Sequence, residues 1–132
     1  MRPTKINEDI VVPRGRIPEM LKALREIADK KDLIIANFGH AGDGNIHVNV
    51  MTDKDDEGEY RKARESVRDI FEAALKLGGT ISGEHGIGLT KKQYMGMELS
   101  DVSIEIMKKI KNVFDPKGIL NPGKMFPSDT YK

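Results

Sequence analysis

The chain has 132 residues, a length that suits one domain with a single core. Its 22 basic and 21 acidic residues give a formal net charge of +1, so it lacks the basic excess that is typical of nucleic-acid-binding domains. It has no cysteine, which excludes disulfides and thiolate ligands and leaves histidine and carboxylate side chains to bind any metal ion.

The first half of the chain alternates between strand and helix patterns. Residues 8–12 end in three β-branched residues and stop at Pro13, which predicts a short strand. A helix is predicted from Pro18, because proline suits a first helical turn and apolar residues follow it at helical spacing. Residues 33–38 and 45–51 are predicted strands, separated by a glycine-rich turn.

The second half is predicted to be largely helical. A charged stretch at residues 53–59 is interpreted as a solvated loop, and the amphipathic helix after it ends at a Gly-Gly pair. A second glycine-rich segment, residues 83–88, precedes a last helix that ends near Phe114, and the polar tail after Met125 is expected to fray. This order of elements predicts an α+β fold: a ferredoxin-like split βαβ antiparallel sheet with helices on one face and a helical C-terminal extension.

The third predicted strand separates its side chains by type. Successive residues of a strand point to opposite faces of the sheet. One face of this strand carries Ile46, Val48 and Val50, and the other carries Asn45, His47 and Asn49. We therefore expect the apolar face to pack on the helices and the second face to line a polar site.

All three histidines of the chain fall in or beside the two glycine-rich segments. His40 ends one predicted strand and His47 lies in the next, so a hairpin would bring the two imidazoles together. Two neutral imidazoles favour a borderline divalent ion such as Zn²⁺, or Fe²⁺ and Mn²⁺ with more oxygen ligands. A further ligand is needed, and Glu84 and His85 in the second segment are the candidates.

A plain structural interpretation fits the same residues. Histidines are often surface or hydrogen-bonded structural residues, and glycines between strands are often simple turns. Asp43 fits either a turn residue or a partner that orients an imidazole, and we favour the turn. The glycines do not follow the G-x-G-x-x-G order and lead into a strand, so a dinucleotide-binding fingerprint is excluded.

Specific motifs span almost the whole chain. They are EDIVVP at residues 8–13, GHAGDGNIHVN at residues 39–49, GTISGEHGIG at residues 79–88 and FDPKGILNPGK at residues 114–124. With these motifs in this order, the chain resembles the C-terminal domain of the FAD-linked oxidases, the family of the glycolate oxidase large subunit, D-lactate dehydrogenase and D-2-hydroxyglutarate dehydrogenase.

The resemblance implies roles for individual residues. His40, His47 and Glu84 would bind a divalent metal, usually zinc, which acts as a Lewis acid on the substrate hydroxyl. His85 would be the base beside the flavin and take the hydroxyl proton while hydride passes to the flavin. The resemblance also implies that Asn49 contacts the substrate hydroxyl or carboxylate. It further implies that Asn121 lies near the flavin.

Measured against the family, residues 1–132 are the C-terminal substrate and metal part. The N-terminal FAD-binding domain and the first part of the substrate domain are not in this sequence, so we expect the chain alone to be inactive. Some members carry a lysine a few residues before the proline that closes the first strand. Here Lys5 and Asn7 flank that place, which leaves the identity of the substrate open.

Two functions are therefore weighed. The first is the C-terminal portion of a flavin-dependent oxidase of a D-2-hydroxy acid such as lactate or glycolate, working with an FAD-binding domain or subunit. The alternative is a non-catalytic ferredoxin-like module that binds a metal or small ligand and self-associates as a homo-oligomer. A nucleic-acid partner is not expected, because no strand presents a stacking pair of aromatic residues.

No segment has the length or apolarity of a membrane span or a signal peptide. We therefore expect a cytoplasmic protein, with peripheral attachment to a membrane through partner subunits as the alternative.

Overall fold

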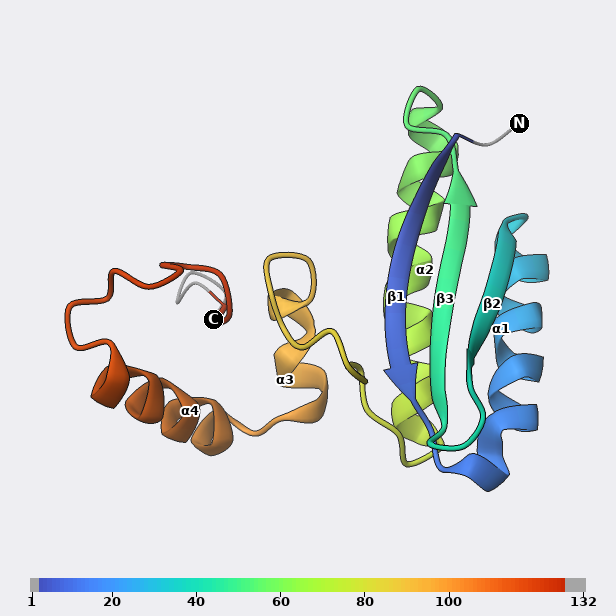
Figure 1. Cartoon of the computed structure of the whole chain (residues 1–132). Helices are drawn as coiled ribbons and strands as arrows, with labels where there is room; N and C mark the ends of the chain where they lie inside the picture. Colours follow the sequence, from blue (N-terminus) through green and yellow to red (C-terminus); the bar gives the residue numbers. More distant parts are fainter. Residues whose placement is uncertain (1–2, 128–132) are drawn as a thin grey trace. The chain divides into compact units, whose positions relative to one another are not determined.

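The computed structural model describes residues 3–127, which divide into two compact units, the first ending at His85 and the second beginning at Gly86. The first unit contains β1 (Thr4–Val11), the short 3-10 helix η1 (Arg14–Arg16), α1 (Ile17–Lys31), β2 (Ile34–His40), β3 (Asn45–Thr52) and α2 (Glu57–Lys76), as Figure 1 shows. The second contains the 3-10 helix η2 (Lys92–Tyr94), α3 (Met95–Glu98) and α4 (Asp101–Phe114).

The three strands of the first unit form an antiparallel sheet in the order β1-β3-β2. The register places His47 of β3 between Asp9 of β1 and Phe38 of β2. Beyond the sheet, the segment after α2 returns to β1 and forms one isolated bridge, between Thr80 and Val11. This return brings a distant part of the chain to the outer edge of β1.

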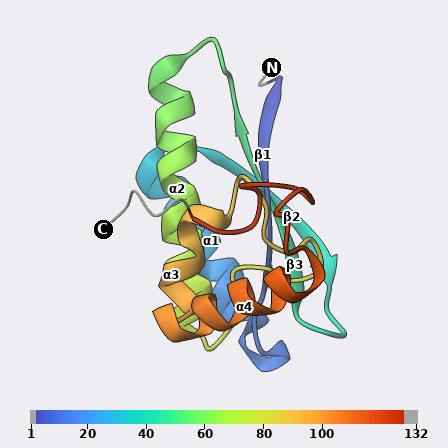
Figure 2. The same ribbon diagram turned by 90° about the vertical axis from the view of Figure 1, so that its left-hand side faces the viewer.

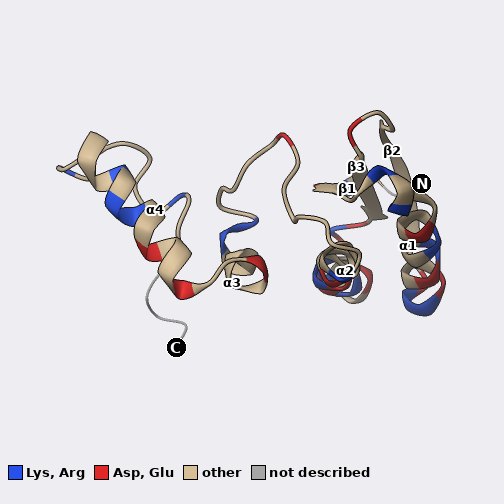
Figure 3. Ribbon diagram, turned by 90° about the horizontal axis from the view of Figure 1, so that it is seen from below, with Lys and Arg blue, Asp and Glu red and all other residues tan. Residues whose placement is uncertain are grey.

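Both long helices cover the same face of the sheet. Seen along the helices, α1 and α2 lie side by side beneath the strands and carry their charged residues mostly on the sides turned away from them (Figure 3). Figure 2 shows α2 running alongside the sheet. Among the described residues of the first unit, no helix packs against the other face of the sheet.

The core lies between this face and the helices. Its fully buried apolar side chains come from the sheet and from both helices and include Ile10, Val48, Val50, Met20, Leu24, Ile70 and Phe71. Burial of such side chains stabilises a fold by roughly 1.5–3 kcal/mol each before the loss of chain entropy is counted. The prediction that the apolar side of β3 faces the helices is thus confirmed, as is the α+β fold class.

Two boundaries differ clearly from the sequence prediction. β1 begins at Thr4 and not at residue 8, because its pairing with β3 continues as far as Thr52. Residues 53–59 are a loop only in their first part, since α2 begins at Glu57. Its N-terminus forms there because the Asp56 carboxylate accepts the backbone N–H of Glu59, a standard N-cap.

The second unit holds the predicted last helix, which is α4 and begins after the capping residue Ser100. Sequence periodicity did not predict the four-residue α3, which is shorter than two helical turns and has too few residues to show a pattern. The end of the polar tail, residues 128–132, lies outside the described residues. None of the helices in the described part of the chain is both long and apolar enough to cross a membrane.

Candidate metal centre

The hairpin between β2 and β3 brings two histidines together. His40 is the last residue of β2, and its backbone oxygen accepts the N–H groups of Asp43 and Gly44 at 3.3 and 3.1 Å. These bonds close the turn, and His47 then stands on the same face of the sheet two residues into β3. The two rings meet edge to face, with centroids 5.8 Å apart.

Glycine is required at two points of this turn. Gly44 has a φ of +85°, a conformation that residues with a Cβ rarely adopt. A Cβ on Gly39 would lie 2.1 Å from the backbone oxygen of Asn45. The glycine-rich composition is therefore a structural requirement of the hairpin that carries both histidines.

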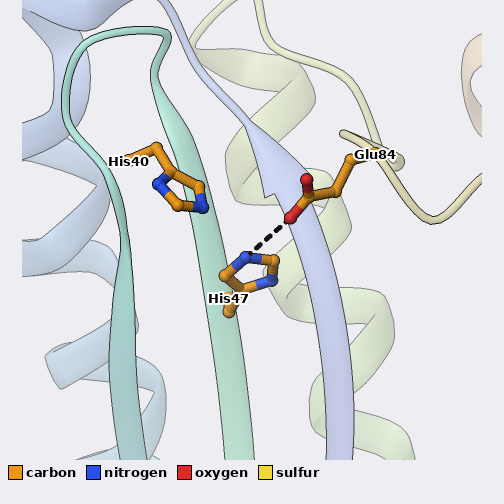
Figure 4. A group of neighbouring side chains, drawn as sticks. All are labelled: His40, His47 and Glu84. Atoms are coloured by element: carbon orange, nitrogen blue, oxygen red, sulfur yellow. Dashed lines mark ion pairs between the residues drawn. The ribbon is translucent and has the colours of Figure 1, made fainter.

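A third potential ligand comes from the second glycine-rich segment. Oε1 of Glu84 lies 3.0 Å from Nε2 of His47 (Figure 4). One potential ligand atom from each of His40, His47 and Glu84 lies within 4.8 Å of the other two. Two imidazoles and one carboxylate form the donor set of many catalytic zinc sites, in which a fourth position stays open for water or substrate. These residues therefore fit a divalent ion.

His85 stands beside this cluster and outside it. Its ring stacks on the ring of His47, with centroids 5.4 Å apart and an interplanar angle of 28°. About half of its side chain is exposed, whereas that of His47 is almost fully buried. The structure thus brings together all four residues that the sequence singles out as ligands or base.

Asn49 continues the polar row along β3 from His47. It lies on the same face two residues further on, and its side chain is buried. Oδ1 of Asn49 accepts a hydrogen bond from Nδ2 of Asn7 on β1 at 3.0 Å. This contact holds the amide of Asn49 in one orientation at the edge of the candidate metal centre.

Two further sequence candidates have other surroundings. Asp43 accepts the backbone N–H of Asn45 at 3.1 Å, as the turn interpretation predicts. Asn121 belongs to the second unit, where its φ is +47° and it lines an apolar hollow of about 630 Å³ beside Phe114 and Leu120. Its role near a flavin stays a prediction.

Sequence reasoning missed Asp9, which is fully buried in the middle of β1. Its Oδ2 accepts the backbone N–H groups of Gly83, Glu84 and His85, and its Oδ1 accepts Nδ2 of Asn45. One signal was present in the sequence: aspartate is depleted in strands, yet Asp9 directly precedes three apolar β-branched residues.

The second unit contains a carboxyl group, Asp115, whose pKa clearly departs from its ordinary value. The hydrogen bond from the Lys111 ammonium lowers the pKa of Asp115, and the backbone N–H groups of Leu120 and Ile119 lower it further. Burial of the carboxyl acts in the opposite direction. Asp115 thus fixes the turn that follows α4.

Comparison with known proteins identifies relatives along nearly the whole chain. The family model described as "FAD linked oxidases, C-terminal domain" matches residues 1–125. Glycolate oxidase subunit GlcD from Bacillus subtilis is 48% identical over 132 residues, which are 100% of this chain and 28% of that protein. The D-lactate dehydrogenase of Anaerostipes hadrus is 42% identical over 118 residues, 89% of this chain and 25% of that protein.

A third relative is D-2-hydroxyglutarate dehydrogenase from Stutzerimonas stutzeri, 42% identical over 127 residues, which cover 93% of this chain and 27% of that protein. The chain therefore spans about a quarter of the length of these relatives.

Proposed function

Because the chain belongs to the FAD-linked oxidases as their C-terminal domain, we propose that it supplies the metal ligands and the proton acceptor of a flavin-dependent 2-hydroxy-acid dehydrogenase. The observation that carries the proposal is the cluster of His40, His47 and Glu84. These residues come from two segments far apart in the sequence, and all three offer the donor atoms that a catalytic divalent ion prefers.

The exposure of the ligands favours catalysis over a purely structural ion. Structural zinc sites are closed by four protein ligands, whereas catalytic sites keep an open position. His40 is exposed, and the side chain of Glu84 is 56% exposed, so this cluster is accessible on one side. Three protein donors with an accessible side are the arrangement that a substrate-binding ion needs.

Each residue then has a defined part in the proposed reaction. A bound divalent ion would polarise the hydroxyl oxygen of the substrate as a Lewis acid. His85, stacked beside His47, accepts the hydroxyl proton on a ring nitrogen. Asn49 binds the hydroxyl or carboxylate of the substrate through its amide, which Asn7 holds in place. FAD, carried by a domain or subunit outside this sequence, is the hydride acceptor.

The substrate class follows from what the named relatives share. Glycolate, D-lactate and D-2-hydroxyglutarate, the compounds in their names, are all 2-hydroxy acids. A hydroxyl beside a carboxylate suits a site that combines a cation with an amide donor. We propose a small D-2-hydroxy acid of the lactate or glycolate type as the substrate and zinc as the metal.

The first test is the metal content of the untagged full chain by elemental analysis. Wild type incubated with zinc and then dialysed is expected to retain about one equivalent, and His40→Ala and Glu84→Ala are expected to lose it. His85→Ala is the matched control, because the proposal makes this histidine the base and not a ligand. A wild-type chain that retains no zinc, iron or manganese contradicts the proposal.

The second test concerns the substrate. D-Lactate and glycolate should shift the NMR signals of the Asn49 amide group in the zinc-loaded chain and leave them unchanged in the zinc-free chain. Shifts of equal size in both forms would contradict binding through the ion.

One observation favours the alternative of a self-associating module. Ile34 and Phe38 are 55% and 61% exposed on the face of the sheet that the helices of the first unit leave open. Analytical ultracentrifugation with and without a 2-hydroxy acid separates the two functions: a stable dimer that does not respond to a 2-hydroxy acid, whether or not it binds metal, would support the module.

A further inference from the structure

A buried carboxylate stands behind the candidate metal centre. Asp9 lies directly opposite His47 in the register of β1 and β3 and has no exposed surface. A carboxylate is costly to bury unless hydrogen bonds replace its lost hydration. The groups that donate hydrogen bonds to Asp9 therefore help to determine the local structure.

Oδ2 of this carboxylate accepts hydrogen bonds from one short segment of backbone. Oδ2 accepts the N–H groups of Gly83, Glu84 and His85 at 3.0, 2.9 and 2.9 Å. Successive backbone N–H groups that converge on one anion form a concave nest for negative charge. Residues 83–85 belong to no helix or strand, so this anion is what organises the segment that carries a ligand and the proposed base.

The other carboxylate oxygen, Oδ1, faces the β2–β3 hairpin. Oδ1 accepts Nδ2 of Asn45 at 2.5 Å and lies 3.9 Å from Nδ1 of His47. The latter separation is too long for a hydrogen bond, so the carboxylate acts on this ring through its charge. Because Nε2 of His47 points to Glu84, Asp9 stands on the side of the imidazole that faces away from the other ligands.

The segment reaches the carboxylate only because residue 83 has no side chain. A Cβ on Gly83 would lie 2.1 Å from Nδ2 of Asn45 and 2.6 Å from Oδ1 of Asp9. Any larger residue would push the segment away from β1. The contact between the strand and the segment therefore needs both the carboxylate of Asp9 and the absence of a side chain at Gly83.

We propose that Asp9 is the positioning residue of the metal centre, which holds Glu84 and His85 beside His47 and supports the His47 ring from behind. Outer partners of metal ligands typically contribute about 10- to 100-fold to metal affinity. The inference rests on the proposed metal-binding function, and it adds the residue that assembles the ligands from separate parts of the chain.

The test compares Asp9→Asn, Gly83→Ala and the double variant in the full chain. Asparagine keeps the size of the side chain but removes the charge that three N–H groups require. Gly83→Ala separates the same contact and leaves Asp9 in place, so the question can still be answered if Asp9→Asn does not fold. Gly88→Ala is the matched control, because a Cβ there has no heavy atom within 4 Å.

Two readouts are measured on folded protein. Zinc affinity, from competition with a chromophoric chelator, is expected to fall by about 10- to 100-fold in each single variant. The zinc affinity of the double variant should be no lower than that of the single variant with the lower affinity, because both substitutions break the same contact. Amide hydrogen exchange without added metal should become faster at Glu84 and His85 in both, while Gly88→Ala behaves as wild type.

The outcomes separate the inference from the proposed function. Wild-type zinc affinity in both single variants would overturn the inference and leave the metal site standing, even if the variants melted at lower temperature. Unchanged amide exchange at Glu84 and His85 would overturn it as well. If wild type binds no metal, the proposed function fails, and faster exchange in the variants would then support only the anchoring of the segment by Asp9.

Discussion

Glu84 and His47 face each other across 3.0 Å from very different surroundings: the imidazole side chain is 9% exposed and the carboxylate side chain 56%. The ring is held on one side by Phe38 of β2 and on another by His85. Glu84 is held at its backbone, whose N–H donates a hydrogen bond to Asp9, while most of its side chain is in contact with solvent. The cluster thus combines a rigid side chain, His47, with an adjustable one, Glu84.

The charge of the adjustable ligand should determine much of the zinc affinity. Glu84→Gln keeps the shape of the side chain but removes its negative charge, and it should weaken zinc binding by more than the ~10- to 100-fold typical of outer partners. Glu65→Gln, on the exposed side of α2, is the control. Chelator competition measures both, and equal affinities for the two variants would argue against Glu84 as a ligand.

Asn7 should affect substrate binding and spare the metal. Asn7→Ala removes the hydrogen bond to Asn49, and a bond of this kind contributes ~0.5–1.5 kcal/mol. We expect a roughly 2- to 12-fold weaker affinity of the zinc-loaded chain for D-lactate, by that same energy scale, with zinc affinity unchanged. NMR titration gives the first value and chelator competition the second. A parallel loss of zinc would mean that Asn7 acts on the whole sheet.

Substitution by alanine should destabilise the fold at one glycine of the β2–β3 turn and have little effect at another. Gly44→Ala places a Cβ 2.0 Å from the backbone oxygen of Val12 at a φ of +85°, whereas Gly42→Ala meets no heavy atom within 4 Å. We expect Gly44→Ala to destabilise the fold by more than ~1 kcal/mol, since strain in this region costs about 1–3 kcal/mol. Gly42→Ala should stay near wild type in urea unfolding followed by circular dichroism.

The two-layer core predicts a similar contrast between isoleucines. Ile70 on α2 is fully buried, and Ile34 on β2 is 55% exposed. Ile70→Ala should lower the free energy of unfolding by ~2–5 kcal/mol because it leaves a cavity. Ile34→Ala should cost less than about 1 kcal/mol, as surface substitutions usually do. Similar losses of stability in the two variants, measured by thermal unfolding, would indicate that the core lies elsewhere.

The turn after α4 should weaken in acid. Because the pKa of Asp115 is lower in the folded chain than in the unfolded one, its ionised form stabilises the fold above the unfolded pKa, near 3.9. This contribution is lost as the pH falls through the lower folded value. Protection factors of the Ile119 and Leu120 amides should decrease below about pH 4.

Asp115→Asn should show reduced protection already at neutral pH and no further decrease of this origin in acid. Asp101→Asn, at the exposed start of α4, is the control. Protection of the two amides that stayed constant down to pH 2 in wild type would contradict the role of this carboxylate.

Local patterns in the sequence predicted much of the fold and the proximity of His40 to His47. Strand alternation placed His47 and Asn49 on one face, and the glycines around His40 indicated the hairpin, because both features depend on neighbouring residues. The part played by Asp9 could not be predicted in this way. The three backbone N–H groups that bind its Oδ2 lie more than seventy residues away, and only the return of the chain to β1 after α2 brings them to Asp9.

The site occupies one end of the sheet, and this has a practical consequence for labelling. β3 starts beside the site at Asn45 and ends seven residues later at Thr52, which pairs with Thr4 at the other end. At about 3.4 Å per residue, roughly 24 Å separate the two ends. The chain has no cysteine, so Asp55→Cys in the exposed connection after β3 would create a unique thiol. A fluorophore attached there would report unfolding of the first unit without competing for the metal ion.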